Sequence, residues 1–216
     1  MYKSFFKRFL DFCIAVVALV LIGWLLVLVI IFLAFANKGA GVFFLQDRPG
    51  KDGKLFKVIK FKTVTDERDA DGKLLPDAKR LTKVGRFIRS TSIDELPQLI
   101  NILKGDMSLI GPRPLLPQYV WVFSDFEKRR LEVRPGITGW AQVHGRNHLK
   151  LSKKFEYDVW YVDHCTLLTD LKIVLMTVKN VLLREDVGEG AGDMKSVDDV
   201  HLSERVKAYK QEMGIQ

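Results

Sequence analysis

Two adjacent carboxylates, Asp94 and Glu95, are the residues whose types and spacing most directly suggest chemistry. They follow Ser92 and precede an apolar pattern at helical spacing from Leu96 to Leu103, which predicts that they lie in the first turn of a helix. In that position, free backbone N–H groups and the helix dipole favour the ionised carboxylate. An ionised carboxylate held in place can act as a nucleophile toward phosphorus or as a ligand for Mg²⁺.

The same stretch also has a purely structural interpretation. Ser92 and Glu95 are three positions apart and have the form of a capping box, in which each side chain accepts a hydrogen bond from a free backbone N–H at the helix start. Spacing alone favours this cap over a catalytic pair. The two interpretations are compatible, so the decision depends on the rest of the chain.

Arg113 is the clearest candidate for binding a phosphate. It lies between Pro112 and Pro114, and two prolines restrict the backbone on either side of it, so that little freedom is lost when its guanidinium binds. The planar guanidinium suits a phosphate. A surface salt bridge is an equally good explanation from the sequence alone.

The overall charge suggests an anionic partner. Among 216 residues, 34 are Lys or Arg and 26 are Asp or Glu, which gives a net charge of +8. Nucleic acid, an anionic membrane face and phosphorylated substrates all fit such an excess. The only two cysteines, Cys13 and Cys165, argue against a disulfide framework and for a reducing compartment.

The N-terminal region contains a membrane element. No charged residue occurs from Phe12 to Ala36, a run that exceeds the ~20 residues needed to cross a bilayer and the ~7–15 of a secretory signal. Basic residues flank it on both sides: Lys3, Lys7 and Arg8 before it, and Lys38, Arg48, Lys51 and Lys54 after it. Because a simple span would place one basic flank outside, a re-entrant helix that breaks near Gly23 is the alternative to a spanning one.

The expected fold class is membrane-associated α/β. It combines the N-terminal re-entrant or spanning membrane helix with a short β-hairpin and with amphipathic helices that lie at the membrane surface. Three regions are expected: a membrane helix over 1–38, a cytoplasmic catalytic domain over 39–185, and a polar tail over 186–216 with a possible amphipathic helix. The elements predicted within them are strands at Val42–Gln46 and Leu55–Lys62, an exposed loop at Thr65–Lys79, helices at Leu81–Arg89, Phe155–Tyr161 and Leu167–Leu183, and stiff turns at Ser108–Pro114 and Arg134–Trp140.

Seven short motifs, in order and at sensible spacing, together resemble the bacterial sugar transferase family, the monotopic phosphoglycosyl transferases, and most closely its small PglC-like members. The resemblance extends from the N-terminus to about Arg184. The motifs are Gln46-x-Arg48-Pro49-Gly50, Lys60-Phe61-Lys62-Thr63, Asp66-Glu67-Arg68, Arg89-Ser90-x-Ser92-x-Asp94-Glu95-Leu96-Pro97-Gln98, Lys104-Gly105-Asp106-Met107-Ser108, Gly111-Pro112-Arg113-Pro114 and Arg134-Pro135-Gly136-Ile137-Thr138-Gly139.

The resemblance implies an enzyme that transfers a sugar-1-phosphate from a UDP-sugar to a polyprenyl phosphate, usually undecaprenyl phosphate, with release of UMP and with Mg²⁺ as cofactor. Asp94 would be the nucleophile of a covalent intermediate and a ligand of Mg²⁺, and Glu95 its catalytic partner. Arg89 and Arg113 match positions expected to bind phosphate. Further candidate substrate-binding residues are Lys60, Arg146 and Asp170.

The resemblance also implies a place in the cell. The protein is expected at the cytoplasmic face of the bacterial inner membrane, in contact with phospholipid and without nucleic acid as a partner. There it would catalyse the first membrane step of glycoconjugate biosynthesis, with downstream glycosyltransferases as possible partners.

Gly23-Trp24 departs from the family's usual Ser-Pro at the helix break. A Pro in a helix interior costs ~3 kcal/mol, about three times as much as Gly.

A second hypothesis from another class is a non-catalytic, membrane-anchored basic module that binds nucleic acid or anionic lipid. The net charge motivates it. No nucleic-acid-binding motif or stripe of alternating basic and aromatic residues supports it.

Overall fold

A β-hairpin lies at the centre of the molecule. The computed structural model describes residues 1–145, 149–183 and 197–215. Strand β1 (Phe43–Pro49) pairs antiparallel with β2 (Leu55–Phe61) along its whole length, from Phe43 opposite Phe61 to Pro49 opposite Leu55. The tight turn between them places Asp52 and Gly53 at positive φ, which suits these residue types. The predicted hairpin is confirmed.

A second, parallel pair of strands joins the two Pro/Gly-rich segments that the sequence indicated only as turns. Strand β3 (Ser108–Ile110) pairs with β4 (Gly136–Thr138). The backbones continue in close contact beyond the strands, since Gly111 N donates to Thr138 O at 2.9 Å. A Cβ on Gly111 would lie 2.3 Å from a backbone oxygen, and one on Gly136 would lie 2.1 Å from a backbone nitrogen. Only glycine fits at these two positions.

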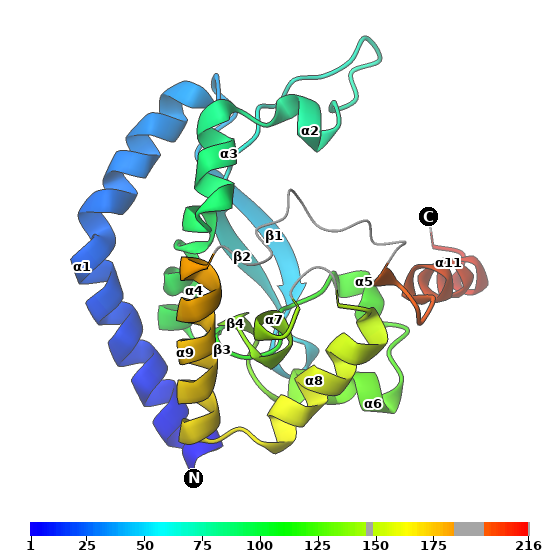
Figure 1. The fold of residues 1–216 in the computed structure, drawn as a ribbon. Coiled ribbons are helices and arrows are strands. Elements are labelled where there is room, and N and C mark those ends of the chain that lie inside the picture. The colour runs from blue at the N-terminus through cyan, green and yellow to red at the C-terminus, as the bar shows by residue number, and fades with distance from the viewer. Residues whose placement is uncertain (146–148, 184–196, 216) are drawn as a thin grey trace.

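The N-terminal helix α1 (Lys7–Ala36) follows a single π-helical turn at Tyr2–Phe6 and bows along one side of the molecule (Figure 1). It continues without interruption through Gly23, so the break that the re-entrant alternative placed there does not occur. One face of α1 packs along its length against α3, α4 and β3, with Ala15 and Leu33 fully buried. By length and composition, α1 with its leading turn is the one helix in the described part of the chain that could cross a membrane.

Buried polar contacts fix the start of α1 to the C-terminal half of the chain. Lys7 Nζ donates to Asp170 at 2.7 Å, and the hydroxyls of Tyr2 and Tyr161 each donate to the same carboxylate at 2.6 Å. One turn further along, Asp11 accepts a hydrogen bond from the Ser108 hydroxyl at 2.6 Å. We call Tyr2, Lys7, Tyr161 and Asp170 the Asp170 clamp. It sets the position of α1 relative to the rest of the molecule.

The remaining helices surround the two sheets (Figure 1). The predicted helices near 81–89, 155–161 and 167–183 are confirmed as α3, α8 and α9, and the predicted loop over 65–79 is largely irregular. The helices are α2 (Asp77–Arg80), α3 (Lys83–Ser90), α4 (Gln98–Lys104), α5 (Pro117–Val120), α6 (Asp125–Lys128), α7 (Trp140–Val143), α8 (Leu151–Asp163), α9 (Leu167–Leu182) and α11 (Leu202–Met213), with 3₁₀ turns at Lys51–Gly53, Ile93–Glu95 and Arg129–Glu132.

The C-terminal helix α11 packs on the side of the molecule opposite α1 (Figure 1). Its buried Leu202 and Val206 join a cluster of aromatic side chains from α5 and α8. Arg205 forms an ion pair with Glu127 of α6 at 3.0 Å. The amphipathic helix predicted in the tail therefore exists, and it supports the segment that follows Arg113.

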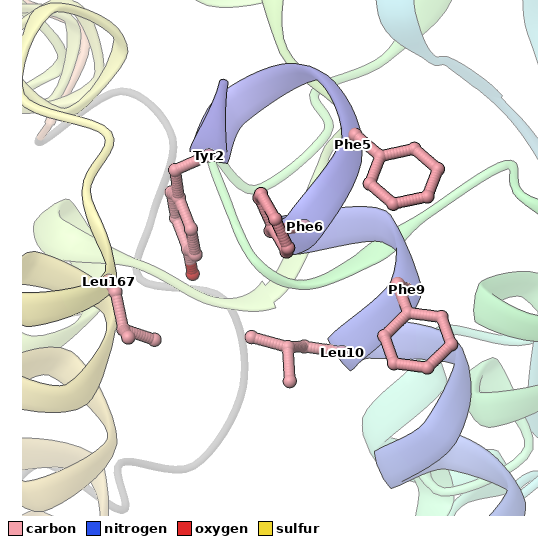
Figure 2. Close-up of a pocket in the computed structure, with 6 residues that line it drawn as sticks. All are labelled: Tyr2, Phe5, Phe6, Phe9, Leu10 and Leu167. Carbon is pink, nitrogen blue, oxygen red and sulfur yellow. The ribbon is translucent and has the colours of Figure 1, made fainter.

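Apolar side chains cover the outer faces of α1 and α9. Val20 and Phe35 of α1 are 77% and 81% exposed, and Leu168 and Leu182 of α9 are 79% and 76% exposed. Where the two helices begin, they enclose a groove of about 490 Å³ with an apolar surface, lined by Tyr2, Phe5, Phe6, Phe9, Leu10 and Leu167 (Figure 2). Contiguous exposed apolar surface of this extent is unusual for a soluble monomer and marks an interaction site.

Candidate active site

Asp94 and Glu95 lie in the short 3₁₀ turn Ile93–Glu95 between α3 and α4, as the sequence predicted for the start of a helix. The residue before this turn, Ser92, has a φ of 57°. A serine rarely adopts this left-handed conformation, and such outliers cluster at functional sites. Ser92 makes no capping hydrogen bond, so the predicted capping box is wrong. The Glu95 side chain points instead toward two cations, which bind a carboxylate more strongly than a neutral N–H does.

Those cations are Lys60 and Arg113. Lys60 Nζ lies 2.7 Å from Glu95 Oε1, and Arg113 Nη2 lies 2.6 Å from the same oxygen. The Glu95 side chain is 17% exposed, Lys60 25% and Arg113 47%. Strand β2 and the proline-flanked turn after β3 thus meet at the acid pair. Two residues predicted for substrate or phosphate binding lie together here.

The two adjacent carboxylates have opposite pKa shifts. Burial alone would raise the pKa of Glu95, but the charges and hydrogen bonds of Arg113 and Lys60 outweigh it and hold that pKa well below its usual range. Burial, and then the negative charge of Glu95, raise the pKa of Asp94 to about 6 against the lowering effect of nearby cations. Paired groups with separated pKa values are typical of functional sites.

Arg113 is held in place through its backbone. Arg130 Nη2 donates to Arg113 O at 2.7 Å and to the Asp158 carboxylate at 2.6 Å. The side chains of Arg130 and Asp158 are each only 2% exposed, so this pair is a fixed support. Sequence reasoning missed both residues, because neither lies in a motif that distinguishes it from surface charges.

Arg89, the other predicted phosphate-binding residue, also lies near the acid pair. Its Nε donates to Thr63 Oγ1 at 2.7 Å, and its Nη2 is 3.5 Å from Asp77. The positive charge of Arg89 contributes to lowering the pKa of Asp94, after those of Lys60 and Arg113. Asp94 therefore lies among three cations.

Two predicted substrate-binding residues do not join this cluster. Arg146 lies outside the described residues. Asp170 is 4% exposed, and its carboxylate accepts hydrogen bonds from Lys7, Tyr2 and Tyr161 in the clamp at the start of α1. Its contacts are with α1 and α8, and its assignment to substrate binding stays a prediction.

The residues present are compatible with one Mg²⁺ ion. Among the described residues there is no group of three or more His, Cys, Asp or Glu side chains that could hold a metal ion. Mg²⁺, however, is usually bound by one or two carboxylates together with substrate phosphates. Both oxygens of Glu95 are engaged by Arg113, whereas no hydrogen bond or ion pair joins Asp94 to another described residue. Asp94 is thus the carboxylate available for a metal.

Comparison with protein families identifies one family. Residues 2–184 match the model described as bacterial sugar transferase. The chain is 55% identical over 168 residues to "Uncharacterized sugar transferase EpsL" of Bacillus subtilis, covering 73% of this chain and 83% of that protein.

Two relatives carry names that state an activity. The chain is 36% identical over 201 residues to the undecaprenyl-phosphate galactose phosphotransferase of Salmonella typhimurium, covering 85% of this chain and 42% of that protein. It is 40% identical over 185 residues to the UDP-glucose:undecaprenyl-phosphate glucose-1-phosphate transferase of Klebsiella pneumoniae, covering 80% of this chain and 39% of that protein. The chain therefore spans about two fifths of the length of these two relatives.

The raised pKa of Asp94 predicts that replacing this residue stabilises the fold at neutral and alkaline pH. Because the pKa of about 6 in the folded state exceeds the ordinary aspartate pKa of 3.8, ionised Asp94 destabilises the folded state fully above pH 6 and not below about pH 4. We expect Asp94→Asn to gain about 1–3 kcal/mol of stability at pH 8 and almost nothing at pH 4. Melting temperatures in detergent across this pH range measure the difference.

Asp47→Asn is the matched control, since it removes the same charge from an exposed position on β1. It should show no gain in melting temperature with rising pH. An Asp94→Asn variant that is no more stable than the parent at pH 8 would contradict the burial argument.

Proposed function

This chain belongs to the bacterial sugar transferase family, and we propose that it transfers a sugar-1-phosphate from a UDP-sugar to a polyprenyl phosphate, such as undecaprenyl phosphate, and releases UMP. The names of the Salmonella and Klebsiella relatives support this reaction class. They name different sugars, galactose and glucose, so the donor sugar of this chain is left open.

The observation that carries the proposal is the difference between the two carboxylates. Glu95 is neutralised by Lys60 and Arg113, whereas Asp94 is joined to no described residue by a hydrogen bond or ion pair. With a pKa of about 6, Asp94 is ionised at neutral pH but poorly stabilised. Such a carboxylate is a competent nucleophile in a site whose cations attract a diphosphate.

In the first step, a carboxylate oxygen of Asp94 attacks the phosphorus that bears the sugar. A bond forms between that oxygen and phosphorus, the anhydride bond to the nucleotide breaks, and its electron pair leaves with UMP. In the second step, an oxygen of the polyprenyl phosphate dianion attacks the same phosphorus and Asp94 leaves as a carboxylate. Neither step requires a proton transfer, provided that both nucleophiles are ionised.

Because no proton needs to move, we assign Glu95 a positioning role. Its low pKa keeps it ionised, so that it holds Lys60 and Arg113 next to Asp94, where they and Arg89 stabilise the charge of the phosphoryl oxygens. Mg²⁺, when bound by Asp94 and the donor diphosphate, would neutralise further negative charge.

The apolar outer faces of α1 and α9 are the proposed membrane contact. Because α1 packs along its length against the rest of the molecule, it could not cross a bilayer without carrying α3 and α4 into the hydrocarbon region. A helix whose outer face enters one leaflet avoids this. It also leaves both basic flanks on the cytoplasmic side, which resolves the charge conflict without a break at Gly23.

We expect Asp94→Asn to abolish UMP release, since an amide is a far poorer nucleophile than a carboxylate. The parent protein, incubated with Mg²⁺ and a labelled UDP-sugar but without acceptor, should acquire a label on the peptide that contains residue 94. Peptide mass spectrometry and UMP quantification measure these outcomes. UMP release by Asp94→Asn at the parental rate would refute the proposed nucleophile.

The activity of the parent protein should fall as the pH drops through about 6, because Asp94 becomes protonated. In Glu95→Gln the neighbouring negative charge is gone, and the freed Lys60 and Arg113 attract Asp94 more strongly. The pKa of Asp94 should therefore fall, and the acid limb of the residual pH–rate profile should move to lower pH. An acid limb that stays in place or moves upward would contradict this coupling.

Membrane contact is tested by changing its apolar surface. Val20→Glu combined with Leu168→Glu should shift the protein from the membrane pellet to the supernatant, whereas Phe126→Glu, on exposed α6, should not.

The topology of α1 is tested by cysteine labelling. The variants Lys3→Cys and Lys38→Cys, each made in a protein without Cys13 and Cys165, should both be protected from an impermeant thiol reagent outside intact spheroplasts. Labelling of one position alone would show that α1 crosses the bilayer.

A further inference from the structure

A small cavity adjoins the pairing of Glu95 with its cations, because Lys60 and Arg113 both line it. It has a volume of about 30 Å³, and its walls come from β1, β2, the start of α4 and the turn around Arg113. Such a volume holds about one or two water-sized atoms. The polar side chains that line it are Gln46, Arg48, Lys60, Gln98 and Arg113.

Among the described residues, the guanidinium group of Arg48 forms hydrogen bonds only with neutral groups. Its Nη2 donates to Gln46 Oε1 at 2.6 Å, and its Nη1 donates to Pro114 O at 3.3 Å. Burial, and then the charge of Arg113, lower the pKa of Arg48. A partly buried cation beside a second cation is costly unless an anion compensates the charge.

Gln98 provides an independent observation on the same cavity. Only 3% of the residue is exposed, and its Nε2 has no hydrogen-bond partner among the residues that the structure describes. Buried amide groups nearly always have a partner, so the Nε2 of Gln98 is a donor available to a ligand. Gln98 lines the cavity together with Arg48 and Arg113.

The charges around the cavity do not balance. Lys60 and Arg113 share one carboxylate, Glu95, and no carboxylate forms an ion pair with Arg48 in the described part of the chain. N–H donors from two guanidinium groups and an amide are the usual ligands of a phosphate oxygen. A neutral ligand would leave the Arg48 charge uncompensated.

We propose that Arg48, Gln98 and Arg113 form an anion subsite that takes an oxygen of a substrate phosphate group other than the one attacked by Asp94. This inference rests on the proposed function, in which two further phosphate groups reach the site: that of the departing nucleoside monophosphate and that of the polyprenyl acceptor. Both have the same oxyanion chemistry. In either case, Arg48 and Gln98 bind and orient a substrate and do not take part in bond breaking.

The first experiment measures binding without turnover. Inorganic phosphate and UMP are titrated into the full-length protein in detergent at constant ionic strength, and the shift in melting temperature gives the dissociation constants. We expect Arg48→Gln to weaken binding of at least one of these probes about 10- to 100-fold and Gln98→Leu about 3- to 10-fold. Arg48→Lys should recover part of the affinity, since it keeps the charge but loses the planar fork.

Lys57→Gln is the matched control. Lys57 lies on β2, is 64% exposed and pairs with Asp47 on the surface, so its replacement removes one positive charge from the same hairpin without changing the cavity. Binding of both probes should change less than twofold. A loss as large as that of Arg48→Gln would mean that only net charge matters and would overturn the subsite.

Stability separates binding from a structural role. Without an anion, Arg48→Gln should melt at or above the parental temperature, because an uncompensated cation is removed. If Arg48 serves only to hold β1 against Pro114, the melting temperature falls and the dissociation constants, measured where the variant is folded, do not change. That combination, or unchanged binding of both probes in Arg48→Gln and Gln98→Leu, would overturn the proposal.

Steady-state kinetics then distinguish the two sources of the phosphate. If Arg48→Gln raises the KM for the UDP-sugar alone, the subsite binds the nucleotide phosphate. If it raises the KM for the polyprenyl phosphate alone, the subsite binds the acceptor phosphate. If each substrate has the same KM with Arg48→Gln as with the parent, the substrate subsite is overturned. If the parent releases no UMP from any UDP-sugar, the proposed function fails, whereas the phosphate titration still tests the anion site.

Discussion

The site depends on how one of two adjacent carboxylates is neutralised. Two unpaired acids side by side would repel each other and the phosphates of any substrate. Lys60 and Arg113 neutralise Glu95, whereas Asp94 forms no ion pair or hydrogen bond with another described residue. Lys60 comes from the paired strand β2, one residue before its end, where a one-residue slip in register would turn it to the opposite face. The hairpin register and the turn after β3 therefore determine the electrostatics of Asp94.

The sequence was sufficient to predict the local elements, and it failed where distant segments meet. Turn residues and hydrophobic periodicity within one continuous stretch of the chain predict both the hairpin and α4. Strands β3 and β4 have three residues each, too few for a period, and pair across 28 positions. Their Pro/Gly motifs therefore indicated turns, although the glycines are there because the two backbones touch.

The candidate site was predicted in part for the same reason. Asp94, Glu95, Lys60, Arg89 and Arg113 were all named from motifs, and the structure brings them together. The capping box at Ser92 was a sound local prediction, but it could not account for two cations that approach from elsewhere in the chain. Arg48 and Gln98 lie in motifs without an evident role. Only the cavity, the neutral partners of Arg48 and the unpaired amide of Gln98 distinguish them.

The Asp170 clamp has a consequence for biogenesis. Lys7 and Asp170 are separated by 163 positions, so that α1 leaves the ribosome roughly ten to thirty seconds before its partner is synthesised. During that interval the nascent helix exposes an apolar surface together with Lys7 and Asp11, which lie one turn apart and can pair with each other. Synthesis of α9 then supplies Asp170, the partner that Lys7 has in the folded protein. Final docking of the first helix must therefore be among the last events of folding.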